Sequence, residues 1–164
     1  MPTPWLNCNG CVLPSDTMVP DDRALRVRIY EWILERGSPP TSTELARSFD
    51  ATPEEIKRTL ASLKVGKTVL LAPSTGEIWM AGPFSAVETP YRVRGAGTRW
   101  FANCAWDMLG VAVLVNEPVQ IDARCTDCAA PMSLSAEPGR APTHPGVVHF
   151  LVPAQRWYDD IGFT

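Results

Sequence analysis

Apolar residues recur at helical spacing in the N-terminal part of the chain. One such stretch covers 22–36 and is followed by Gly37, a common helix stop. A shorter stretch begins after Thr41 or Ser42, either of which can cap a helix. The positions expected to face the core are Leu25, Ile29, Trp32, Ile33, Leu45, Ala46 and Phe49. Two helices are therefore predicted here.

A third helix is predicted over "ATPEEIKRTLASLKVG". Thr52 is its expected N-cap, Pro53 takes the first helical position, and Glu55 at the third completes a capping box. After it, "TVLLA" and "EIWMA" alternate apolar and polar positions around the turn "PSTG", which predicts a hairpin. Three helices followed by a hairpin are typical of a winged helix.

The pattern changes after residue 82. A loop rich in proline and glycine leads into a helix expected to begin near Arg99, and "EPVQIDARC" and "APMSLSAE" predict two strands around "CTDC". "GVVHFLVP" predicts another strand, and "AQRWYDDIGF" begins a helical segment. The fold class is therefore α+β. The predicted division is an irregular arm at 1–20, a winged-helix-like domain at 21–82 and a small mixed α/β domain at 83–164.

Composition narrows the function classes. The chain has 164 residues, 45% of them hydrophobic, which is enough for a sizeable core, and a net charge of −3. Basic and acidic residues are equally numerous between residues 21 and 80, and Glu54 and Glu55 open the third helix, where a DNA reader needs positive charge. We therefore expect no nucleic-acid and no membrane partner. Because the N-terminus lacks the pattern of a secretory signal, we expect a cytoplasmic protein.

The stretch "FANCAWDMLG" contains the first pair of candidate reactive residues. Cys104 and Asp107 are three residues apart, so on a helix they share one face. A cysteine in the first turn of a helix is expected to be stabilised as a thiolate, which is a soft metal ligand. A carboxyl in apolar surroundings, here Phe101 and Trp106 as pocket walls, can hold a proton at neutral pH. The spacing alone is a weak signal, and it is more typical of a buried structural cysteine beside a surface carboxylate.

Four segments in order resemble the organomercurial lyase (alkylmercury lyase) family: "FSAVETPYRV", "RWFANCAWDMLG", "ARCTDCAAPMSL" and "VVHFLVPAQRWYDDIGFT". The resemblance implies protonolysis of a carbon–mercury bond, giving a hydrocarbon and Hg(II). In that scheme Cys104 holds mercury as a thiolate, and Asp107 protonates the departing carbon. It implies no cofactor, an organomercurial as substrate, cellular thiols as partners, and mercuric reductase as an acceptor of Hg(II).

The resemblance also implies a second catalytic cysteine, whose place falls at Thr164 or immediately after it. Three explanations stay open: an inactive relative that only binds mercury or another soft ion, a sequence cut early, and selenocysteine at that position. We expect the 164-residue form to be much less active than one carrying a thiol or selenol there. A metal-sensing, DNA-binding winged helix is a further, less favoured alternative.

The other cysteines form two C-x-x-C pairs, Cys8 with Cys11 and Cys125 with Cys128. Together they have the four thiolates of a structural zinc site, although 113 residues separate the pairs, far more than is usual. The favoured interpretation is thiols without a metal. A further hypothesis is that Cys8 or Cys11 replaces the second catalytic thiol. The only histidines, His144 and His149, are expected to be structural.

Overall fold

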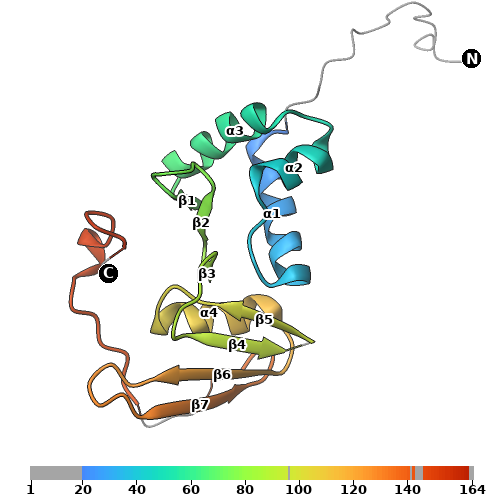
Figure 1. Cartoon of the computed structure of the whole chain (residues 1–164). Coiled ribbons are helices and arrows are strands. Elements are labelled where there is room, and N and C mark those ends of the chain that lie inside the picture. The colour runs from blue at the N-terminus through green and yellow to red at the C-terminus, as the bar shows by residue number, and fades with distance from the viewer. Residues whose placement is uncertain (1–19, 96, 141, 143–145, 163–164) are drawn as a thin grey trace, which may run out of the picture.

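The three predicted helices are present at the predicted places. The computed structural model of the protein describes residues 20–95, 97–140, 142 and 146–162, shown in Figure 1. The side-chain oxygens of Thr41 and Thr52 each accept a hydrogen bond from the backbone N–H of a glutamate three residues on. The carboxylate of that glutamate accepts the backbone N–H of the same threonine. These capping boxes fix where the second and third helices begin. The helices are α1 (Asp22–Arg36), α2 (Ser42–Phe49) and α3 (Pro53–Val65).

A three-stranded antiparallel sheet follows the helices. Its strands are β1 (Val69–Leu71), β2 (Ile78–Ala81) and β3 (Phe84–Ser85), in the order β1-β2-β3. β1 and β2 form the predicted hairpin, whereas β3 lies where only a loop was expected. The assignment of this part to the winged-helix class and the division at residue 82 stay predictions.

A second antiparallel sheet has the order β5-β4-β6-β7. Helix α4 packs against β4 and β6 (Figure 1). The α+β class is confirmed, as are the two strands predicted around "CTDC". The bounds are β4 (Arg92–Gly95), β5 (Thr98–Phe101), α4 (Ala105–Val115), β6 (Val119–Arg124) and β7 (Pro131–Ala136).

Two predictions were wrong. The helix begins at Ala105 and not near Arg99, because residues 98–101 pair with 92–95 as an antiparallel hairpin. The segment from Gly146 to Pro153 forms no strand; it connects to the short 3₁₀ helix η1 (Ala154–Arg156).

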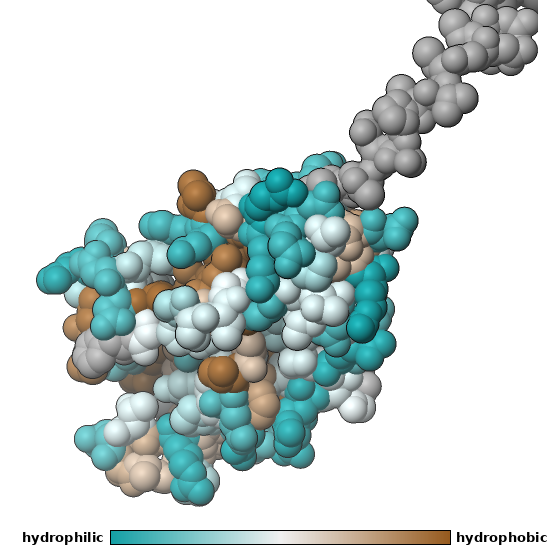
Figure 2. Space-filling model, turned by 45° about the horizontal axis from the view of Figure 1, so that its top comes forward, coloured by the Kyte–Doolittle hydropathy of each residue, from teal (hydrophilic) through white to brown (hydrophobic). Residues whose placement is uncertain are grey.

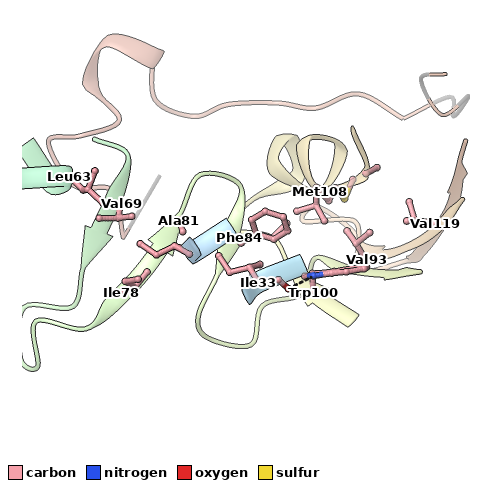
Figure 3. Close-up of a cluster of buried hydrophobic side chains, with 14 of the residues drawn as sticks. Ile33, Leu63, Val69, Ile78, Ala81, Phe84, Val93, Trp100, Met108 and Val119 are labelled. Atoms are coloured by element: carbon pink, nitrogen blue, oxygen red, sulfur yellow. Dashed lines mark hydrogen bonds between the residues drawn. The ribbon is translucent and has the colours of Figure 1, made fainter. Parts of the chain in front are cut away.

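One hydrophobic core links the helices to both sheets. Trp100 of β5 is fully buried, and its indole N–H donates to the carbonyl of Ile33 in α1 over 2.8 Å (Figure 3). Phe84 pairs with Ala102 in an isolated bridge between the sheets. These contacts hold the end of β5, and with it the start of α4, in a fixed place.

The C-terminal segment turns back toward the first hairpin (Figure 1). The ammonium of Lys67 lies 3.9 Å from the ring centroid of Tyr158, and Gly162 packs so closely on Trp79 that an added Cβ would lie 3.0 Å from the indole. On the face in Figure 2, hydrophobic residues gather in separate patches among hydrophilic ones. None of the helices in the described ranges has the length and apolar character needed to cross a membrane.

Candidate active site

Cys104 is the N-cap of α4. Its backbone is extended, with φ −148° and ψ −179°, and its sulfur accepts the N–H of Asp107 over 3.4 Å. The thiol therefore lies at the positive end of the helix dipole, one position before the first turn in which it was expected. The described ranges contain three free cysteines, Cys104, Cys125 and Cys128.

Asp107 lies in the same turn and next to the thiol. The Cys104 thiol and the Asp107 carboxyl are within hydrogen-bonding reach of each other. On the other side, the Asn103 amide donates to Asp107 Oδ2 over 3.1 Å. The structure therefore brings together the two residues singled out in the sequence.

Burial dominates the ionisation of both groups. It raises the pKa of the Cys104 thiol, and the nearby Asp107 carboxylate adds to this, against the lowering effect of the backbone N–H groups of Asp107 and Trp106. Burial also raises the pKa of Asp107, while the hydrogen bonds from Asn103 and Cys104 oppose the rise. The expectation of a stabilised thiolate was wrong in direction, because desolvation outweighs the helix start. Burial thus favours the protonated form of both groups.

The pair opens onto a cavity of about 400 Å³. Its walls come from the start of α4, the β1–β2 hairpin and the C-terminal segment. The aromatic residues that line it are Tyr91, Trp106, Phe150, Trp157 and Tyr158. An aromatic cavity with one thiol and one carboxyl suits a small, largely apolar ligand that carries one soft centre.

The two predicted pocket walls differ in position. Trp106 lines the cavity, and it is 57% exposed, so it lies at the rim. Phe101 does not line it. Side chains alternate along β5, so Phe101 shares a face with Arg99, whose guanidinium lies 5.3 Å from the centroid of its ring. The interpretation of Phe101 as a pocket wall is therefore corrected.

Asn103 is a site residue that the sequence interpretation missed. Its side-chain N–H group donates both to the Gly82 carbonyl, over 2.9 Å, and to Asp107. Its Oδ1 is buried and has no hydrogen-bond partner among the described residues. Asn103 thus fastens the carboxyl to the loop after β2. Only its place directly before the cysteine could have indicated this role.

Replacing Asn103 by alanine is expected to raise the pKa of Asp107 further. The Asn103 amide donates to the ionised carboxylate and so favours the ionised form. Without this amide, only the hydrogen bond from Cys104 still opposes the effect of burial on the pKa of Asp107. A ¹³C NMR titration of the aspartate carboxyls, with Asp107→Asn used to assign the signal, would measure the change. An unchanged or lower pKa in the variant would contradict this.

The remaining candidates lie elsewhere. Cys125 and Cys128 occupy the turn between β6 and β7 and do not line the cavity. His149 and Cys125 line a different, smaller cavity of about 260 Å³. The described ranges contain no group of three or more His, Cys, Asp or Glu that could hold a metal ion. Outside those ranges lie Cys8, Cys11, His144 and Thr164.

Comparisons with known proteins agree on one family. Residues 84–163 match the family model described as "MerB: Alkylmercury lyase". A protein of Streptomyces lividans named alkylmercury lyase is 24% identical over 106 residues, which cover 65% of this chain and 47% of that protein. The chain thus spans about half the length of this curated relative.

A solved structure is also similar. It is described as the mercury-bound form of MerB2, with a TM-score of 0.56 and 21% identity, covering 80% of this chain and 62% of that chain. At this identity the likeness shows a shared fold. The resemblance in the sequence and the fold therefore indicate the same group of proteins.

Proposed function

Residues 84–163 belong to the organomercurial lyase family, and from this premise we propose that the chain cleaves carbon–mercury bonds by protonolysis. Cys104 binds the mercury atom, and Asp107 delivers the proton to the carbon that leaves. The observation that carries the proposal is that this thiol and this carboxyl lie within hydrogen-bonding reach of each other in the lining of an aromatic cavity.

The first step is the transfer of the organomercurial cation to sulfur. The Cys104 thiol gives its proton to the Asp107 carboxylate as the sulfur–mercury bond forms, and the ligand that mercury carried leaves as an anion. Because the carboxyl already lies within hydrogen-bonding reach of the thiol, the proton moves a short way and stays in the site. The products are a mercury thiolate and a neutral carboxylic acid.

The second step breaks the carbon–mercury bond. Asp107 protonates the carbon, the electron pair of the carbon–mercury bond goes to the new C–H bond, and the hydrocarbon leaves. Asp107 is again a carboxylate, and Hg(II) remains on Cys104. The raised pKa of Asp107 supports this role, because an acid that is weaker than usual keeps its proton until the carbon is in place.

The Hg(II) that remains needs another soft ligand. We propose that a cellular thiol supplies it and that mercuric reductase, in the cytoplasm, accepts the ion. The place that the family pattern implies for a second cysteine, at or after Thr164, lies outside the described residues. The organic group of the substrate would lie among the aromatic walls, which include Tyr91 and Trp157.

The test is hydrocarbon release from phenylmercury. The purified chain is mixed with phenylmercuric acetate and an excess of a monothiol, and benzene is measured by gas chromatography. We expect release to follow protein concentration and to persist in Cys128→Ser, a control that removes an exposed thiol outside the cavity. Retention of mercury without benzene would overturn the lyase in favour of the soft-ion-binding alternative.

A further inference from the structure

The turn between β6 and β7 holds two free thiols, Cys125 and Cys128, on a hydrogen-bonded backbone. The N–H of Cys125 donates to the Ala130 carbonyl, and the N–H of Ala129 donates to the Cys125 carbonyl, each over 2.9 Å. The guanidinium of Arg124 adds a hydrogen bond to the Ala129 carbonyl over 3.2 Å. Six residue-to-residue pairings of β6 with β7 anchor the turn at its base. Backbone hydrogen bonds and strand pairing thus close the turn on which the two thiols lie.

The two sulfurs face each other across this turn. The Cys125 sulfur accepts hydrogen bonds from the backbone N–H groups of Asp127 and Cys128 and from the Cys128 thiol. Cys125 is partly exposed and Cys128 is exposed, so an ion can reach both from solvent. Backbone N–H groups that point at a sulfur offset the negative charge that a metal-bound thiolate carries.

We propose that Cys125 and Cys128 form a second metal site, which binds one thiophilic ion of the Hg²⁺ or Cu⁺ type through two thiolates. Sulfur is the ligand that such soft ions prefer. In the part of the chain that the structure describes, no third His, Cys, Asp or Glu completes a cluster with the pair, and these ions are satisfied by two sulfurs. Each thiol that is still protonated releases its proton to solvent as its sulfur–metal bond forms.

This site is separate from the Cys104 cavity. Neither cysteine lines that cavity, and the pair lies at the end of the β6–β7 hairpin, while Cys104 begins α4. The proposal therefore does not rest on the lyase activity, and it holds whether or not phenylmercury is cleaved. It gives a role to a C-x-x-C pair that the cleavage steps do not use.

The experiment isolates the pair in the full chain. Cys8, Cys11 and Cys104 are replaced by serine, so that Cys125 and Cys128 are the only cysteines left. This variant is mixed with one equivalent of Hg²⁺ and a tenfold excess of a monothiol, and bound mercury is counted by native mass spectrometry. We expect one Hg²⁺ per chain, because two thiols on one turn act at a high effective concentration that separate monothiols lack.

Two further variants decide the outcome. Adding Cys128→Ser or Cys125→Ser to this background is expected to lower mercury retention at least tenfold, and circular dichroism should show the fold unchanged. Equal retention after removal of either cysteine would overturn the dithiolate site. So would a background variant that loses Hg²⁺ to the monothiol but keeps Zn²⁺, because the site would then suit a different class of ion.

Discussion

Cys104→Ser is expected to lower the rate of benzene release from phenylmercury by about 10³-fold or more, which is the usual loss of rate when a catalytic nucleophile is removed. A serine oxygen is a hard ligand with a far higher pKa than a thiol, so it neither draws mercury from a competing thiol nor gives Asp107 a proton. Serine is also a favoured N-cap, so it can accept the Asp107 N–H and keep the start of α4. Single-turnover release of benzene measures the change.

The control for Cys104→Ser is a measurement of thermal stability, which shows whether the variant keeps its fold. Because serine preserves the cap, its midpoint of thermal unfolding should stay within a few degrees of that of the parent chain. The pair Cys125 and Cys128 stays intact in this variant, so total mercury bound is not a measure of the cavity; the cleavage rate is. A variant that releases benzene as fast as the parent would show that another thiol takes the mercury.

The helices were predictable because their signals are local. Thr52 and Glu55 form the predicted capping box, and Thr41, one of the two candidate caps of the second helix, forms another with Glu44. The start of α4 was not predictable in this way. The apolar run that includes Trp100 and Phe101 fits a strand and a helix equally, and only the pairing of β5 with β4 decides between them.

In the candidate site too, the features set by neighbouring residues were predictable and those set by distant segments were not. The closeness of Cys104 and Asp107 depends on the start of one helix, so the spacing indicated that they could meet, and the family resemblance was needed to favour a shared site. The roles of Asn103 and Tyr91 depend on contacts with distant segments, and spacing carries no sign of them. The ionisation of Cys104 was mispredicted for a related reason: the helix start is visible in the sequence, whereas the burial that outweighs it is a property of the whole fold.

Asp107→Asn is expected to separate mercury binding from cleavage. Asparagine has nearly the shape of aspartate and can still accept the Asn103 amide, but it carries no proton to deliver to carbon. Benzene release should fall by about 10²- to 10⁴-fold, the usual contribution of a general acid, while Cys104 still binds phenylmercury at equilibrium. Mass spectrometry of the phenylmercury adduct and gas chromatography of benzene measure the two properties on one sample. Equal benzene release by both proteins would remove Asp107 from the mechanism.

The pH dependence of the parent chain gives a second test of the same carboxyl. Cleavage needs Asp107 ionised to take the thiol proton and Cys104 protonated to give it, so the rate should fall below the pKa of Asp107 and above that of Cys104. Both pKa values are raised by burial, which shifts this window toward alkaline pH. The residual cleavage rate of Asp107→Asn should not show the fall at acid pH, which is the acid limb of the pH–rate profile. An acid limb that persists in the variant would assign it to another group.

Asp107→Asn should lower the rate of cleavage but raise the stability of the folded chain at alkaline pH. Because the pKa of Asp107 is raised in the folded state, its contribution to stability is fully present below the unfolded pKa and is lost as pH rises through the folded pKa. Asparagine has no charge to bury, so the variant should unfold at a higher temperature than the parent at pH 8, and the two should converge at acid pH. A variant less stable at pH 8 would show that the start of α4 stabilises the charge more than burial penalises it, and the raised pKa on which the proton-delivery step depends would then be wrong.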